Sequence, residues 1–212
     1  MKPILYNYFR SSSAYRVRIA FHLKKIDFEY RPINLLKSEQ KSDSYLKINP
    51  KGEVPFLIDG NIKLSQSLAI CEYLDAKWNE PLLFPQELNE RMKCLEICEL
   101  IGAGIQPAHN LAILDELTKR FGADDTKRAD WCRHFMEKGL AALEKILEGT
   151  AGKYSLGNTL TAADIFLVPQ VFAANRFKVD IAKFPIIKKV NDTCLLLEAF
   201  ERAEPSRQID AV

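Results

Sequence analysis

The chain has 212 residues, of which 47% are hydrophobic and 27% are charged, a composition typical of a globular protein and not of a disordered or fibrous one. Its 30 Lys and Arg residues balance 28 Asp and Glu residues, which excludes the strongly basic surface of a nucleic-acid-binding protein. No stretch approaches the roughly 18 apolar residues of a membrane helix, and five scattered cysteines are typical of reduced thiols. We therefore expect a cytoplasmic protein with no nucleic-acid or membrane partner.

The first 78 residues alternate between strand patterns and helix patterns. We predict a strand, a helix, a second strand, a short helix, a hairpin and a third helix, at residues 4–9, 11–24, 28–33, 42–48, 54–64 and 68–77. Asp59 and Gly60 form the turn of the hairpin, because this pair tolerates the positive φ of a tight turn. Pro55 cannot donate to a sheet, so its strand is expected at an edge or with special local geometry.

A proline-punctuated connector at residues 79–86 separates this first domain, residues 1–78, from a second domain, residues 87–212, whose periodic stretches are all helical. Helices are predicted at residues 87–119, 127–148, 161–176 and 185–200. Pro107 removes a backbone donor, so the first of these helices should bend near residues 103–107. Thr161 and Asp164 have the spacing of a capping box at the start of the third helix.

Most of the chain shows no arrangement typical of a catalytic or metal site. Each histidine stands alone in a helical stretch: His22, His109 and His134. The Gly102–Gly104 pattern lacks both the third glycine and the preceding strand of a dinucleotide-binding loop, which favours close helix packing instead. Cys94 and Cys98 have no histidine or second cysteine pair at ligand spacing, so we expect no bound metal.

Ser11, Ser12 and Ser13 lie where the first strand meets the first helix. A helix start exposes unpaired N–H groups and a partial positive charge, so it is a candidate anion site, and a thiolate there would be stabilised by hydroxyl donors. None of the cysteines of the chain occupies this place, so a sulfur at this site would arrive with a ligand. An ordinary N-cap explains the same serines, and both interpretations stay open on these residues alone.

Residues 2–20 resemble the N-terminal signature of the zeta-class glutathione transferases, the maleylacetoacetate isomerases. In this signature, three residues separate the Ser11-Ser12 pair from the Arg16-Val17-Arg18 run. Segments along the rest of the chain are also similar to this family, at residues 49–55, 66–70, 106–111, 167–180 and 197–200. The resemblance implies an α/β thioredoxin-like N-terminal domain and an all-α C-terminal domain, the glutathione transferase architecture. It also implies a homodimer, with glutathione as cofactor in the cleft between the two domains.

The resemblance further implies roles for individual residues. Glutathione is expected to contact Ser11, Ser12, Ser13, Ala14, Tyr15, Arg16, Gln40, Val54, Gln66, Ser67, Gln106, Asn110, Leu111 and Ala112. Ser11 would donate to the sulfur, Val54 before a cis Pro55 would pair with the cysteinyl unit, and Gln66 and Ser67 would bind the γ-glutamyl carboxylate. Catalysis would use the three serines, with Arg16 and Arg176 holding the carboxylates of a dicarboxylate substrate.

The activity implied is the cis–trans isomerisation of 4-maleylacetoacetate to 4-fumarylacetoacetate, in tyrosine and phenylalanine catabolism, by reversible addition of the glutathione thiolate. Two kinds of alternative stay open. The first is a related enzyme, either a transferase acting on haloacids or an isomerase of maleylpyruvate, and the second is a non-catalytic ligand-binding relative. Three positions depart from the family pattern. Ser13 replaces the usual Cys, Tyr15 replaces Trp or His, and Lys25 replaces a Gly, which costs up to about 1 kcal/mol if that residue is left-handed.

Overall fold

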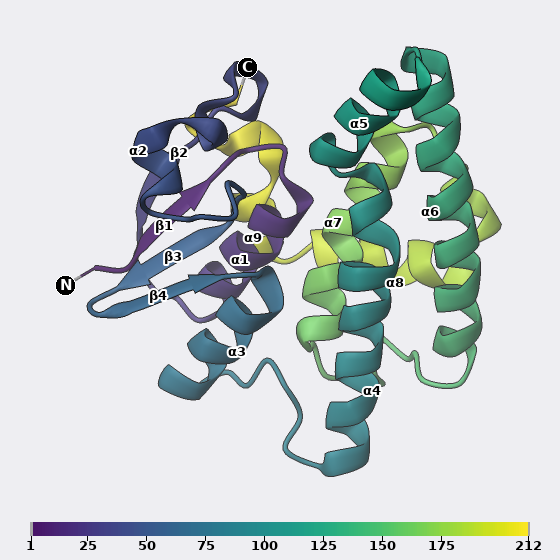
Figure 1. The fold of residues 1–212 in the computed structure, drawn as a ribbon. Coiled ribbons are helices and arrows are strands. Elements are labelled where there is room, and N and C mark those ends of the chain that lie inside the picture. Colours follow the sequence, from purple (N-terminus) through teal and green to yellow (C-terminus); the bar gives the residue numbers. More distant parts are fainter. Residues whose placement is uncertain (1, 212) are drawn as a thin grey trace. The chain divides into compact units, whose positions relative to one another are not determined.

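A computed structural model describes residues 2–211 and divides the chain into two compact units (Figure 1). The first unit combines Met1–Leu83 with Leu197–Val212, and the second is Phe84–Leu196. The first unit contains β1 Ile4–Asn7, α1 Ser12–Leu23, β2 Glu29–Pro32, α2 Asp43–Leu46, β3 Phe56–Asp59, β4 Ile62–Ser65, α3 Ser67–Lys77 and α9 Glu198–Ala203. The second contains α4 Leu88–Glu99, α5 Leu111–Phe121, α6 Asp125–Glu148, α7 Ala162–Arg176 and α8 Pro185–Leu195.

A four-stranded sheet with the order β2-β1-β3-β4 forms the centre of the first unit. β1 runs parallel to β2 and antiparallel to β3, and β3 and β4 form the predicted hairpin. Gly60 has a φ of +60° in its turn, as the Asp-Gly pair predicts. Pro55 lies just before β3, in a cis peptide bond with Val54, so the ladder does not need the missing N–H.

Helices α1 and α3 pack against each other next to the sheet (Figure 1). Along α1, Val17, Ile19 and Phe21 are completely buried, which is the apolar burial that the helix pattern predicts. The buried Lys24 at the end of α1 pairs with Asp75 of α3, with 2.8 Å between Nζ and Oδ1. This ion pair fixes the end of one helix to the other.

The C-terminal segment belongs to the first unit, which differs from the predicted second domain of residues 87–212. In Figure 1, α9, in yellow, lies against α1, and the buried Phe200 and Ala203 of α9 form this contact. The Arg18 Nε of α1 donates to the Ala203 carbonyl at 3.0 Å. The predicted helix of residues 185–200 is accordingly two helices, α8 and α9, with extended backbone at Leu197. An amphipathic pattern indicates a buried face but not the core that buries it.

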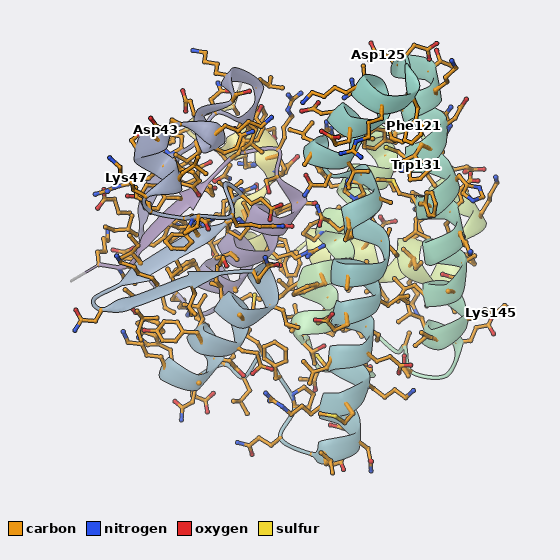
Figure 2. The ribbon with its side chains drawn as sticks, viewed as in Figure 1. Asp43, Lys47, Phe121, Asp125, Trp131 and Lys145 are labelled. Carbon is orange, nitrogen blue, oxygen red and sulfur yellow. The ribbon has the colours of Figure 1, made fainter. Side chains whose placement is uncertain are left out.

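The second unit consists of five α-helices and shorter helical turns within its described residues. Asp125 lies in the first turn of α6 and Lys145 in the last, and Figure 2 shows them toward opposite ends of this long helix, where each complements the helix dipole. Gly139 in the middle of α6 allows Ile105 to approach, because a Cβ at Gly139 would overlap the Ile105 side chain. Close packing therefore occurs at Gly139. The exposed Gly104, where we predicted it, makes only ordinary contact with Leu100.

The predicted helix of residues 87–119 is interrupted and not merely bent. After α4 the backbone forms a π-helical turn at Leu100–Ile105 and a 3₁₀ turn at Gln106–His109, and α5 begins after Asn110. Pro107 cannot donate to an α-helix, and Asn110 is extended with a φ of −67° and a ψ of 139°. The bend predicted near residues 103–107 is thus the beginning of a complete break.

Buried carboxylates close two helix starts of the second unit. Asp164 of α7 accepts a hydrogen bond from the Thr161 N–H at 2.9 Å, as the capping-box spacing predicts. Glu144 of α6 accepts from the N–H groups of Ile186 and Ile187 at 2.7 and 3.0 Å, which caps α8 from a neighbouring helix. A search for an apolar helix long enough to cross a membrane finds no candidate in residues 2–211.

Candidate active site

Three consecutive serines lie at the start of α1. Ser11 is the N-cap, and its Oγ accepts a hydrogen bond from the Ala14 N–H at 3.1 Å. The Ser11 O–H hydrogen remains able to donate to a ligand, so the N-cap and the donor interpretations are compatible. Ser12 is buried and Ser13 half-buried, and the first turn of α1 has no acidic residue. The positive end of the helix dipole is therefore not neutralised by the helix itself.

Arg10 adds a cation directly before this helix start, and sequence analysis did not select it. Its Nη2 donates to the Tyr8 hydroxyl at 3.2 Å, and its guanidinium lies 5.3 Å from the centre of the Phe9 ring. The Nε atom is buried and has no hydrogen-bond partner among residues 2–211. A signal was present in the sequence, because Arg10 directly precedes the serines that we interpreted as an anion site.

The start of α3 is the second helix terminus of the candidate site. Unlike the start of α1, it has no side-chain cap within the described residues. Its N-cap residue Gln66 has a φ of 71° and a ψ of 119°, which is uncommon for a residue other than glycine. No side-chain hydrogen bond caps this end in the described part of the chain, and Gln66 is exposed. The N–H groups of residues 67–69, at the helix start, point toward a position suited to a carboxylate.

Arg16 connects the two helix starts. Only 2% of its surface is exposed, and its Nη1 donates to the Ser67 Oγ at 3.1 Å. The arginine that the resemblance assigns to the substrate is therefore held inside the first unit against the first residue of α3. This contact makes Arg16 suited to orienting Ser67, in addition to adding positive charge near both helix starts.

A third element of the first unit offers backbone and amide groups. Tyr45 and Asn49 both donate to the Glu53 carbonyl at 2.8 Å, which fixes the chain just before Val54. Neither the N–H nor the C=O of Val54 is hydrogen-bonded to another residue in the range 2–211. The Gln40 Oε1 is buried and also has no partner within this range. Unpaired buried polar groups are rare in folded proteins, so these atoms suit a peptide-like ligand.

The site residues predicted in the second unit surround the break before α5. Gln106 is half-buried at the start of the 3₁₀ turn, and Asn110 caps α5 by accepting from the Ala112 N–H at 3.0 Å. The predicted helix of residues 87–119 contains both Gln106 and Asn110, which is wrong because the helix is broken between them. Leu111 is half-buried and Ala112 is exposed. Trp131, labelled in Figure 2, donates from Nε1 to the Ala108 carbonyl at 2.9 Å and anchors this break to α6.

Arg176 is the last residue of α7, and its side chain is exposed. Its guanidinium lies 5.8 Å from the centre of the Phe177 ring. Arg133 of α6 donates to the Phe177 carbonyl at 3.4 Å, so the end of α7 is tied to α6. An exposed arginine at the end of a helix is compatible with contact to an anion from outside the chain, but exposure alone does not require such a contact.

The cysteine thiols of the chain, and His22 in helix α1, are poorly suited to chemistry at this site. The five cysteines are all completely buried. Burial raises the pKa of Cys132 to about 11, which disfavours its thiolate. Burial also lowers the pKa of His22 to about 4, assisted by Arg202 and Arg18, so this histidine is neutral at pH 7. A thiolate at the start of α1 must therefore come from a ligand.

Comparisons with known proteins identify the family and the fold of the chain. The model of the glutathione S-transferase N-terminal domain matches residues 1–76, and that of the C-terminal domain matches residues 114–199. Together these models define the class of fold, and the predicted architecture of a thioredoxin-like domain followed by a helical domain is confirmed. The chain belongs to the glutathione S-transferase family, and full-length relatives are named as zeta class.

Particular relatives are isomerases by name. Maleylacetoacetate isomerase of Rattus norvegicus is 45% identical over 211 residues, which cover 99% of this chain and 95% of that protein. A holo structure of a bacterial zeta-class maleylpyruvate isomerase has a TM-score of 0.96 and 39% identity, covering 99% of this chain and 100% of the other. Maleylacetoacetate isomerase of Anaeromyxobacter dehalogenans, solved with glutathione in its active site, has a TM-score of 0.90 and 38% identity, covering 100% and 98% of the two chains.

Proposed function

We propose that the protein is a glutathione-dependent cis–trans isomerase that converts 4-maleylacetoacetate to 4-fumarylacetoacetate. One observation carries the proposal. Two helix starts of the first unit, at Ser11 and Gln66, have no acidic residue in their first turn and are joined through the buried Arg16. Such a pair suits a small ligand with a thiolate and a carboxylate, and glutathione carries both. The names of the relatives support the choice of substrate.

The residues of the first unit fit glutathione, because polar atoms without partners lie where the resemblance places the ligand. The N–H groups at the start of α3 would bind the γ-glutamyl carboxylate, with Ser67 held in place by Arg16. The Val54 backbone would pair with the cysteinyl unit, and the Gln40 Oε1 would accept from a ligand N–H. Ser11 would donate its hydroxyl hydrogen to the sulfur, with Ser12 and Ser13 nearby.

When bound, glutathione would supply a thiolate for reversible addition to the cis double bond. The new C–S bond makes that double bond a single bond, and after rotation about it the C–S bond breaks, which expels the thiolate and restores the double bond in the trans form. The chain must keep that sulfur ionised near neutral pH. The Ser11 hydroxyl and the positive end of α1 would do so, because both favour the charged form. Each unit by which the thiol pKa falls corresponds to about 1.4 kcal/mol.

Arginines would hold the two carboxylates of the substrate. Arg176 keeps the role that the resemblance assigns to it, because its side chain is exposed at the end of α7. Arg10 suits the same task better than the buried Arg16, because the Arg10 side chain is only partly buried and its Nε has no partner in the part of the chain that the structure describes. A guanidinium stays charged at any working pH and can bind a carboxylate through two parallel hydrogen bonds.

Two further features belong to the proposal by analogy with the family. We propose a homodimer, and the exposed apolar side chains of Ile62, Leu88 and Met92 are candidates for burial in it. We also propose a cytoplasmic location, since the five scattered cysteines form no disulfide within residues 2–211, which suits a reducing compartment.

Maleylpyruvate is a second candidate substrate, because the bacterial maleylpyruvate isomerase is similar over the full length of this chain.

One assay tests the function directly. The loss of maleylacetoacetate is followed with glutathione, without it, and with S-methylglutathione, which retains the carboxylates but has no thiol. We expect isomerisation only with glutathione, and no consumption of glutathione over many turnovers. Stoichiometric consumption would instead assign a conjugating transferase, and equal rates in all three reactions would remove glutathione from the reaction.

A further inference from the structure

The C-terminal tail ends beside the turn that precedes α1. Asp210 is 201 residues from Phe9 in the chain, yet its Oδ2 accepts a hydrogen bond from the Phe9 N–H at 3.0 Å. The Oδ1 atom of the same carboxylate accepts from the Tyr30 hydroxyl of β2. One carboxylate thus joins the tail, the end of β1 and β2 within the first unit.

Arg18 holds the same turn from the other side. It is fully buried, and its Nη2 donates to the Phe9 carbonyl at 2.9 Å, while its Nε donates to the Ala203 carbonyl of α9. Burial lowers the pKa of Arg18 to about 10, although two tyrosines and Asp210 raise it, so the guanidinium is still charged at neutral pH. Both backbone polar groups of Phe9 are therefore held by charged side chains.

This arrangement does more than attach the tail. Taking a guanidinium and a carboxylate out of water is costly, and apolar side chains such as Phe200 already dock α9. What the two charges add is a defined backbone geometry at Phe9. That residue lies inside the turn closed by the hydrogen bond from the Ser11 N–H to the Tyr8 carbonyl at 3.0 Å. The position of the Ser11 hydroxyl follows from this turn.

We propose that Asp210 is a positioning residue of the glutathione site, which acts through the Phe9 backbone to aim the Ser11 hydroxyl at the sulfur. The inference rests on the proposed function, since it needs a thiolate at the start of α1. A donor has to lie within a fraction of an ångström of its productive position to stabilise a charge. Asp210 therefore belongs to the site, although it lies 201 residues from Phe9 in the sequence.

The experiment compares Asp210→Ala and Asp210→Asn with the parent chain and with Glu201→Ala. Glu201 is a matched control, because its carboxylate lies in the same tail but pairs only with the exposed Arg207, at 2.6 Å, among the ion pairs of residues 2–211. Absorbance titration gives the pKa of the bound glutathione thiol, and equilibrium titration gives the affinity for S-methylglutathione. We expect Asp210→Ala to raise the thiol pKa by about one unit and to lower turnover near pH 7 about tenfold.

The other variants separate positioning from folding. Asp210→Asn keeps an acceptor and should lie between the parent and Asp210→Ala, and Glu201→Ala should match the parent. The affinity for S-methylglutathione should stay within about twofold in every variant, because the peptide contacts lie elsewhere. A thiol pKa in Asp210→Ala and Asp210→Asn equal to that of the parent overturns the inference alone. A parent chain that does not lower the thiol pKa at all overturns the proposed function, and the inference with it.

Discussion

Two helix starts of the second unit, those of α7 and α8, differ from those of α1 and α3 in the first unit by the groups that lie at them. In the second unit, carboxylates lie at the starts of α7 and α8. Asp164 accepts a hydrogen bond from the N–H of Thr161, the N-cap residue of α7, and Glu144 accepts from the N–H groups of Ile186 and Ile187 in the first turn of α8. In the first unit, α1 and α3 begin with Ser11 and Gln66 and have no acidic residue in their first turns. Every helix start has the same four unpaired N–H groups. The difference is whether the negative charge that meets them comes from a carboxylate of the chain or from outside it.

This difference separates structural helix ends from binding ones. A helix start that is closed by a carboxylate of its own chain is already neutralised and contributes stability. A start that is left with a hydroxyl or an exposed amide keeps its positive potential for an anion from outside. Arg16 strengthens this potential in the first unit, because it adds a buried cation beside Ser67. Three substitutions, taken from the largest expected effect to the smallest, test the comparison.

Replacing Glu144 should affect stability and not chemistry. Glu144→Ala leaves the part-buried N–H of Ile186 and the buried N–H of Ile187 without their acceptor. Each donor costs up to about 2 kcal/mol, or up to about 4 kcal/mol in total. Denaturant unfolding measures this loss, and turnover per folded molecule should not change. Glu148→Ala is the matched control, because the Glu148 carboxylate is exposed and pairs with Lys145, so its removal should cost less than about 1 kcal/mol. Equal losses in both variants would contradict the structural role of the closed helix start.

Replacing Ser11 should affect chemistry more than stability. Ser11→Ala removes the donor to the sulfur, which should cost about 3 kcal/mol in the transition state, or roughly 100-fold in turnover, and should raise the pKa of the bound thiol. It also removes an N-cap, at about 1 kcal/mol of stability. Ser42→Ala separates the two effects, because Ser42 is the N-cap of α2, with 3.3 Å from its Oγ to the Tyr45 N–H, and we assign it no role in binding. If Ser42→Ala and Ser11→Ala lower turnover equally, Ser11 is only a cap.

The opposite end of α1 should give the smallest effect. Lys25 has a φ of 53°, so it lies in the left-handed region where the family pattern has a glycine, and its side chain is exposed. Lys25→Gly should therefore raise the free energy of unfolding by up to about 1 kcal/mol without changing turnover. Lys25→Ala is the control, because it removes the long side chain but keeps the Cβ that the left-handed backbone disfavours. A similar gain in both variants would assign the effect to the charge of the lysine.

Local features of the fold could be predicted because each depends on a few neighbouring residues. The Asp59-Gly60 turn, the Thr161 capping box and the alternation of strands and helices before residue 78 are patterns of this kind. The left-handed backbone at Lys25 was also predictable, since it needed only the place of one missing glycine. Such features depend on intrinsic backbone preferences, which the neighbouring residues largely determine.

Features that depend on distant partners could not be predicted in this way. The tail of residues 197–211 carries the same amphipathic pattern whichever unit buries it. Contacts with distant residues, such as those of Arg18 and Asp210, place the tail in the first unit. In the site, the sequence pointed to the serines and to Gln66. It did not predict the burial of Arg16 or its hydrogen bond to Ser67, a contact between residues 51 positions apart. Periodicity contains no information about such a contact, and it also did not predict the break before α5.

The central claim is that the open helix starts of the first unit bind a ligand anion, and closing one of them tests it most directly. Ala69 is exposed in the first turn of α3, where Ala69→Asp would supply the carboxylate that α7 and α8 already have, and Ala69→Asn keeps the shape without the charge. Calorimetric titration with S-methylglutathione should show affinity at least about tenfold weaker for Ala69→Asp, about 1.4 kcal/mol, with stability equal or slightly higher. Ala69→Asn should bind nearly as well as the parent. Unchanged affinity in Ala69→Asp would contradict the assignment of the α3 start as the carboxylate site.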